Sequence, residues 1–158
     1  MSFEPLVLIG MPGAGKTEGG RLLAARHGVP FHDLDAMVTA GSGMSPVDFI
    51  LGGRETEFRH WEAALLRKWM ANPEGVMATG GGTPAIPEAF TLLQGFPLVV
   101  WLDTPLPLRL ARLQASPRPP LVPGNPERSM LMLEITRRPL YEHLARRRIA
   151  DIRELFTP

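Results

Sequence analysis

A glycine-rich segment near the start of the chain has the spacing of a phosphate-binding loop. Residues 10–17 read GMPGAGKT and follow an apolar run at residues 6–9. This arrangement fits the pattern GxxxxGK[ST] between a strand and a helix, in which backbone amides surround phosphate oxygens. In such a loop Lys16 reaches the β- and γ-phosphates of a nucleotide, and the Thr17 hydroxyl is a ligand for Mg²⁺. The alternative is a glycine turn that binds nothing. The predicted phosphate site consists of Gly13, Ala14, Gly15, Lys16 and Thr17.

A bound nucleotide does not by itself define a reaction, but the rest of the sequence narrows the classes. The chain has 158 residues and carries neither an Asn-Lys-x-Asp guanine signature nor a strand of four apolar residues ending in Asp-Glu. Guanine-nucleotide switches and ATPase motors are therefore disfavoured. A small-molecule kinase is favoured.

Two carboxylates follow the second predicted strand, at residues 29–32. If the backbone stays extended through Asp33-Leu34-Asp35, both carboxylates point to one side, about 7 Å apart. One can then serve Mg²⁺ while the other binds an acceptor hydroxyl. The alternative is that Asp35 caps a helix and Asp33 is merely solvated.

Residues on a helix and in a glycine turn are candidates for an acceptor site. Arg59 and Glu62 are three residues apart in a predicted helix, so their side chains can pair, although a surface ion pair is the alternative. Gly80, Gly81 and Gly82 follow a short strand and offer bare backbone where a small ligand must approach closely. The alternative for this turn is a flexible connection without a ligand.

Two further arginines have a possible role in phosphate or carboxylate binding. Arg118 lies in a proline-rich loop at residues 115–126, from which it could cover the phosphates and exclude water. Arg137 could supply a second guanidinium to a carboxylate, because its planar fork matches that group. Taken singly, each could equally be a solvated arginine.

The elements that must position these residues alternate between strands and helices. Strands are predicted at residues 6–9, 29–32, 76–78, 98–102 and 148–152, and helices at 17–27, 54–71, 105–114 and 127–145, with a kink or boundary at Pro139. This order favours an α/β fold with a mainly parallel sheet, whose ligands gather at the carboxyl ends of the strands.

Composition excludes several other kinds of protein. The sequence has no cysteine, which excludes disulfides, thiolate metal sites and a cysteine nucleophile. The net charge of +1 provides no overall field for nucleic acid or a membrane surface, and no apolar run is long enough to span a bilayer. We therefore expect a cytoplasmic protein without nucleic-acid or membrane partners. A monomer is a separate expectation, which composition does not decide.

The motifs GMPGAGKT, DLD, EFRHWE, GGG, an Arg-Pro pair and RRPLY occur in this order within residues 6–152. This ordered set resembles the shikimate kinase family, which belongs to the P-loop kinases related to nucleoside monophosphate kinases. The resemblance implies one P-loop kinase domain over residues 1–158, with a three-layer α/β/α fold and a five-stranded, mainly parallel sheet. It also implies a mobile lid at about residues 112–126 and an acceptor-binding helical region at about 34–62.

The resemblance further implies transfer of the γ-phosphoryl group of ATP to the 3-hydroxyl of shikimate, with Mg²⁺, on the route to chorismate and the aromatic amino acids. Its implied catalytic residues are Lys16, Asp35 and Arg118, with Asp35 as the candidate base. Its implied nucleotide-binding residues are the phosphate site above with Arg112, Arg118 and Arg153. Its implied shikimate-binding residues are Asp35, Arg59, Glu62, Gly80, Gly81, Gly82 and Arg137. Its implied magnesium-binding residues are Thr17 and, through water, Asp33.

Three departures from the family pattern set further expectations. A second proline, Pro120, follows Arg118-Pro119 where the family has leucine, which is expected to alter lid closure. The spacing to the lid leaves Arg109 as an alternative to Arg112 for stacking on adenine. The sequence ends six residues after Ile152, so a shortened adenine loop is expected to weaken nucleotide binding.

Two other functions remain open from the sequence. One is a related kinase for another small acceptor, such as gluconate or a nucleoside monophosphate. The other is a nucleotide-binding accessory domain without turnover.

Overall fold

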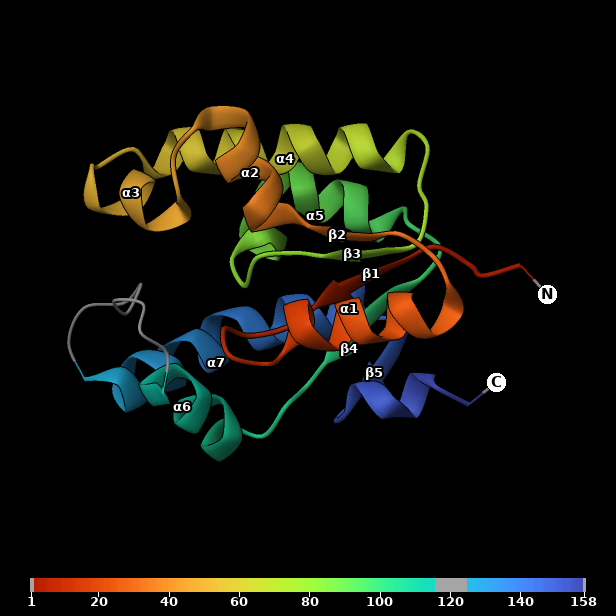
Figure 1. The fold of residues 1–158 in the computed structure, drawn as a ribbon. Helices are drawn as coiled ribbons and strands as arrows, with labels where there is room; N and C mark the ends of the chain where they lie inside the picture. Colours follow the sequence, from red (N-terminus) through yellow and green to blue (C-terminus); the bar gives the residue numbers. More distant parts are fainter. Residues whose placement is uncertain (1, 116–124, 158) are drawn as a thin grey trace.

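The computed structural model describes residues 2–115 and 125–157, which form a sheet of five parallel strands flanked by helices (Figure 1). The strand order is β2-β3-β1-β4-β5, and every neighbouring pair is parallel. The strands are β1 (Leu6–Ile9), β2 (Phe31–Asp33), β3 (Val76–Ala78), β4 (Val99–Leu102) and β5 (Arg147–Ile149). The α/β class and the parallel five-stranded sheet predicted from the sequence are confirmed.

The helices cover both faces of the sheet and complete three layers (Figure 1). They are α1 (Lys16–His27), α2 (Leu34–Ser42), α3 (Pro46–Leu51), α4 (Glu55–Met70), α5 (Pro87–Gln94), α6 (Leu106–Ala115) and α7 (Pro126–Leu144), with 3₁₀ turns η1 (Thr83–Ala85) and η2 (Ile152–Leu155). Because side chains alternate along a strand, Val7 and Ile9 of β1 pack with α4, α5 and α7. Leu6 and Leu8 pack with α1 on the opposite face.

Two glycines inside α1 allow this helix to lie close to its neighbours. A Cβ atom at Gly20 would lie 2.7 Å from the Phe31 ring and 3.0 Å from the Leu8 side chain. At Gly19 it would meet Ile152 of η2 at 3.1 Å. This close packing, of Gly20 on the sheet and of Gly19 on η2, holds the start of α1 beside the carboxyl end of β1, where the phosphate loop lies.

Several element boundaries differ from those predicted. None of the short helices α2, α3 and α5 was predicted as a separate element, although the helical region implied at about residues 34–62 contains α2 and α3. For α3 the local cause is a capping box in which Ser45 and Asp48 bond reciprocally to each other's backbone amides. Of the kink or boundary predicted at Pro139, the boundary is wrong, because α7 continues beyond this residue to Leu144.

The segment 116–124, with Arg118 and most of the predicted lid, lies outside the described residues. Of the helices that are described, none is both long and apolar enough to cross a membrane.

Candidate active site

The loop between β1 and α1 has the backbone of a phosphate site. Gly13 and Gly15 adopt φ values of 77° and 91°, which residues with a side chain rarely adopt. α1 begins directly after Gly15, so its unpaired amides and its positive dipole end face this loop. The Thr104 hydroxyl, which follows β4, donates to the Ala14 carbonyl at 2.7 Å and holds the loop in place.

Lys16 is folded over the carbonyl groups of its own loop. Its Nζ atom donates to the carbonyl oxygens of Gly10 at 2.6 Å and Met11 at 3.1 Å, and the residue is buried. Burial lowers the pKa of Lys16 to about 8, although the nearby Asp35 carboxylate opposes this shift. A buried ammonium group gains strongly from an incoming phosphate, whose negative charge offsets the cost of burying the cation.

Thr17 and Asp33 provide oxygen atoms beside the loop. The Thr17 hydroxyl donates to Asp33 Oδ2 at 2.6 Å. The other carboxylate oxygen of Asp33 accepts from the Ala36 amide at 3.1 Å and caps α2. A hydroxyl and one carboxylate suit Mg²⁺, which prefers oxygen ligands and takes its remaining ligands from phosphates and water. In residues 2–115 and 125–157 no group of three or more His, Asp or Glu side chains could hold a metal ion.

The extended backbone expected through Asp33-Leu34-Asp35 is not found. The strand ends at Asp33 and α2 begins at Leu34, so Asp35 lies in the first helical turn. The physical reason is the N-cap bond of Asp33, a residue type that favours this position. The alternative expectation of a cap at Asp35 is also wrong, because the capping residue is Asp33.

The glycine turn after β3 lies against the carboxylate of Asp35, on the acceptor side of the site. A Cβ atom at Gly80 would lie 2.9 Å from Glu62 Oε1, 3.1 Å from Asp35 Oδ1 and 3.2 Å from Thr83 Oγ1. Only glycine leaves room for these three groups around one backbone position. The structure therefore brings together Asp35, Glu62 and Gly80, three of the residues that the resemblance implies for the acceptor site.

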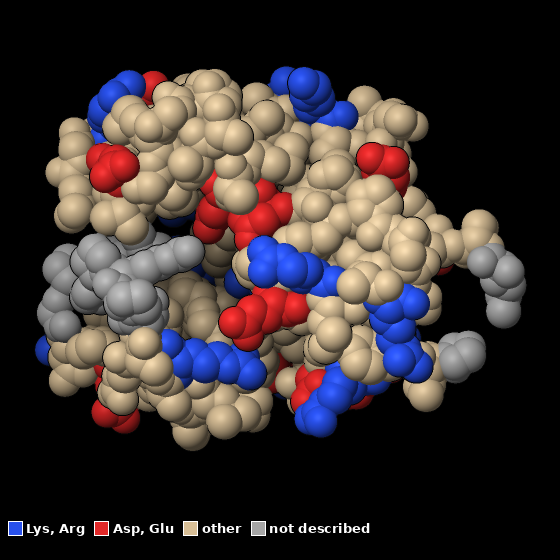
Figure 2. Space-filling model, in the orientation of Figure 1, with Lys and Arg blue, Asp and Glu red and all other residues tan. Residues whose placement is uncertain are grey.

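The same turn is flanked by two guanidinium groups. A Cβ atom at Gly82 would lie 2.7 Å from Arg59 Nη1, and one at Gly81 would lie 3.2 Å from Arg137 Nη1 and 2.9 Å from Pro12 of the phosphate loop. Figure 2 shows acidic and basic side chains around the hollow in the middle of this face of the molecule. Glycine backbone, two cations and a carboxylate thus lie directly beside the phosphate loop.

The charges around the two arginines differ. Arg59 Nη1 donates to Glu62 Oε2 at 2.7 Å, as predicted, and its Nη2 lies 3.4 Å from Glu55. Burial lowers the pKa of Arg137, while Tyr141 raises it and the neighbouring charge of Arg59 lowers it. Two guanidinium groups held within mutual electrostatic reach favour an anion between them.

Arg112 and Arg109, the two candidates for stacking on adenine, differ in their exposure to solvent. Arg112 Nη1 donates to the carbonyls of Gly13 at 3.1 Å and Ala14 at 2.8 Å, so it borders the phosphate loop. Arg109 is only 2% exposed and pairs with Glu134, which removes it from any surface on which a base could stack.

Arg153 is exposed and lies at the start of η2. It pairs with Asp151 at 2.5 Å, and this bond is the largest cause that lowers the Asp151 pKa to about 2. The charge of Arg112 contributes to the same shift, so Arg112 lies within electrostatic reach of this turn.

Two residues that the sequence did not single out complete the acceptor side. The buried Tyr141 hydroxyl donates to the Gly81 carbonyl at 2.6 Å, and Thr83 donates to Glu62 Oε1 at 2.7 Å. Tyr141 lies one helical turn after Arg137, and this spacing was the available signal. Nothing in the sequence distinguishes Thr83 from any other residue that follows a turn.

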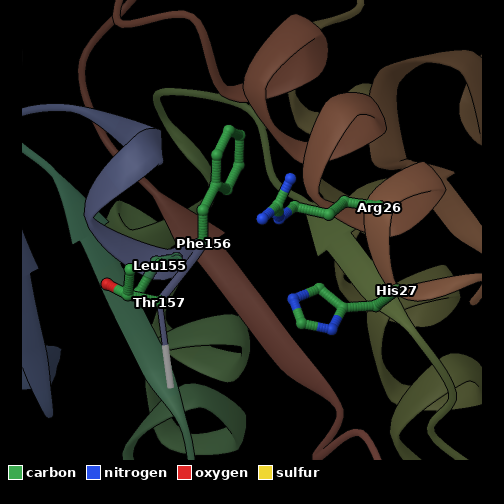
Figure 3. Close-up of a pocket in the computed structure, with 5 residues that line it drawn as sticks. All are labelled: Arg26, His27, Leu155, Phe156 and Thr157. Carbon is green, nitrogen blue, oxygen red and sulfur yellow. The ribbon is translucent and has the colours of Figure 1, made fainter.

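A separate pocket lies at the far end of α1 (Figure 3). It is lined by Arg26, His27, Leu155, Phe156 and Thr157. The Arg26 guanidinium lies over the Phe156 ring, 5.1 Å from its centre. A twelve-residue helix is roughly 18 Å long, so this pocket cannot share a small ligand with the phosphate loop.

Comparison with known proteins gives consistent matches. A family model described as shikimate kinase matches residues 12–155. The chain is 39% identical over 152 residues to a shikimate kinase of Symbiobacterium thermophilum, a match that covers 94% of this chain and 87% of the relative.

Two solved structures are similar over nearly the whole chain. The shikimate kinase from Acinetobacter baumannii in complex with shikimate has a TM-score of 0.85 and 32% identity, covering 96% of this chain and 88% of that one. The shikimate kinase from Aquifex aeolicus has a TM-score of 0.79 and 26% identity, covering 96% and 93%.

Proposed function

The chain belongs to the shikimate kinase family and is an ATP-dependent kinase that phosphorylates shikimate, and from this premise we propose how its residues divide the reaction. The observation that carries the proposal is the turn at residues 80–82. It lies between Arg59, Arg137 and Asp35 and touches the phosphate loop through Pro12. An acceptor bound at this turn is next to the γ-phosphate of a nucleotide bound in the loop.

The phosphate loop and its neighbours hold ATP in this proposal. Backbone amides at the start of α1 and the Lys16 ammonium group bind the β- and γ-phosphates. Arg112 stacks on adenine, which its position at the border of the loop supports. Thr17 and, through water, Asp33 would hold Mg²⁺, which would supply positive charge to neutralise the phosphates.

The acceptor side of the site holds shikimate by its carboxylate. Arg59 and Arg137 grip that carboxylate, and the Asp35 carboxylate accepts a hydrogen bond from the 3-hydroxyl. As the hydroxyl oxygen bonds to the γ-phosphorus, the bond from that phosphorus to the bridging oxygen of ADP breaks, and the hydroxyl proton passes to Asp35. A loose phosphoryl-transfer transition state depends mainly on position and charge neutralisation, so a weak base suffices.

Other parts of the proposal concern residues at the edge of the site. Arg118, outside the described residues, neutralises charge on the transferred phosphoryl group as part of a lid at about residues 112–126. Arg153 contributes to nucleotide binding beside Arg112. We further propose a single-domain monomer in the cytoplasm, a reducing compartment that suits a sequence without cysteine.

The acceptor test is ADP release from ATP and Mg²⁺, with shikimate, quinate, gluconate and AMP as separate acceptors. Turnover is expected with shikimate, because the paired arginines select a carboxylate and AMP carries none. Efficient turnover with AMP, or ATP binding without turnover on any acceptor, would contradict the assignment. Light scattering during gel filtration tests the monomer.

A further inference from the structure

We propose that Thr83 is a positioning residue of the acceptor site, whose hydroxyl holds Glu62 so that Arg59 faces the acceptor carboxylate. This inference rests on the proposed role of Arg59 as a carboxylate-binding group. Thr83 itself touches neither substrate. It acts through two side chains, Glu62 and then Arg59.

Hydrogen bonds connect Thr83 to Glu62 and Glu62 to Arg59. Glu62 and Thr83 both have 0% exposure, so neither can exchange its partner for solvent. Glu62 divides its carboxylate oxygens, with Oε1 accepting from Thr83 at 2.7 Å and Oε2 accepting from Arg59 at 2.7 Å. The Thr83 amide also donates to the Gly80 carbonyl at 3.2 Å, which fixes the hydroxyl relative to the glycine turn. The Glu62 carboxylate therefore fixes the position of the Arg59 guanidinium relative to the turn at residues 80–82.

Arg59 has an alternative partner toward solvent. Its Nη2 lies 3.4 Å from Glu55, a carboxylate with a side chain that is 62% exposed. If Glu62 loses its anchor at Oε1, the carboxylate can rotate or take up a proton, and either change loosens its bond to Arg59. The guanidinium can then swing toward Glu55, away from Gly82. An acceptor carboxylate would lose one of its two cations.

The ionisation of Glu62 depends on the same hydroxyl. Burial raises the Glu62 pKa, and Arg59 and the hydrogen bond from Thr83 oppose that shift. The other charged groups facing Glu62 are Asp35 on α2, which raises its pKa, and Arg137 on α7. Without the Thr83 hydroxyl the ionised Glu62 carboxylate accepts one hydrogen bond fewer. Its pKa therefore rises, and Glu62 takes up a proton at a higher pH.

The variants that test this are Thr83→Val, which keeps the shape and removes the hydroxyl, and Thr83→Ser, which keeps the hydroxyl. Thr83→Val is expected to raise the KM for shikimate by about tenfold, as expected for one lost hydrogen bond to a charged group. The acid limb of its kcat/KM profile for shikimate should move up by about one pH unit. The KM for ATP should stay unchanged, and Thr83→Ser should restore both values.

Three controls separate the inference from its premise. Thr91→Val removes a hydroxyl that donates to the Pro87 carbonyl of its own helix, and this variant should leave every constant unchanged. Arg59→Lys should raise the KM for shikimate; an unchanged value would refute the carboxylate role, and with it the premise. The methyl ester of shikimate lacks the charge, so Thr83→Val and the parent protein should have the same KM for it.

The inference is overturned if Thr83→Val matches the parent in KM and pH profile while Arg59→Lys does not. It is also overturned if Thr83→Val raises the KM values for shikimate and ATP alike and serine does not restore them, because that result indicates general loosening. Should the valine variant fail to fold, Thr83→Ala against Thr83→Ser gives the same comparison, and equal shikimate KM values for these two would overturn it.

Discussion

Lys16 couples phosphate binding to the stability of the protein, and this coupling predicts an unusual pH dependence. Its pKa falls from an ordinary 10.5 to about 8 because the group is buried. Between these two values the unfolded chain keeps a proton that the folded protein has lost. The free energy of unfolding therefore rises with pH in this window.

The size of the effect follows from the two pKa values. Linkage gives an increase of about 2 kcal/mol in the free energy of unfolding between pH 7 and pH 10 for this single group. Tyr141, whose pKa burial raises to about 12, acts in the opposite direction only above about pH 10, since its unfolded value is near 10. The comparison of the parent protein with Lys16→Met cancels Tyr141 and every other group, leaving the contribution of Lys16.

The assay is urea unfolding of both proteins, without nucleotide, at pH 7, 8, 9 and 10. The parent is expected to gain about 2 kcal/mol relative to Lys16→Met across this range. A difference that stays constant with pH, or that falls, would refute the argument for a buried charge. A second readout is ATP affinity, which should weaken in the parent above pH 8 by up to about tenfold per pH unit, because the phosphates bind the protonated lysine.

Four further outcomes are expected, all by steady-state kinetics. Asp35→Asn should lower kcat by roughly 10²- to 10⁴-fold with ATP binding intact, and near-normal turnover would remove its role as proton acceptor. Gly80→Ala should raise the KM for shikimate in a folded protein, since its Cβ would lie 2.9–3.2 Å from three oxygen atoms; an unchanged KM would show that the site tolerates the methyl group. Tyr141→Phe removes the donor to the Gly81 carbonyl and should raise the same KM roughly tenfold or less, whereas a change confined to ATP would contradict this placement. Arg112→Ala should raise the KM for ATP alone, and an effect on shikimate alone would contradict its position beside the phosphate loop.

Local backbone rules explain which parts could be predicted from the sequence. The phosphate loop was predictable because its glycines supply the positive φ values at Gly13 and Gly15 that the loop requires. The long amphipathic helix was predictable because apolar residues recur every three or four positions. Its period also placed Arg59 beside Glu62, which the structure confirms at 2.7 Å.

The parts that escaped prediction depend on competition between local structures or on distant contacts. The Asp33 side chain caps α2 and ends β2, so two carboxylates that would point to one side of an extended chain lie instead at the cap and in the first turn of a helix. The contact of Thr83 with Glu62 joins residues 21 positions apart, and only the turn after β3 brings them together. Whether Arg109 or Arg112 borders the loop depended on helix rotation, which buries the first and turns the second toward Gly13.

The most direct test of the account is a crystal structure of the protein with shikimate and ADP. The account predicts the shikimate carboxylate between Arg59 and Arg137, with the 3-hydroxyl within hydrogen-bond distance of Asp35 and facing the phosphate loop. A carboxylate bound away from both arginines, or a ring whose 3-hydroxyl faces away from Asp35, would contradict it.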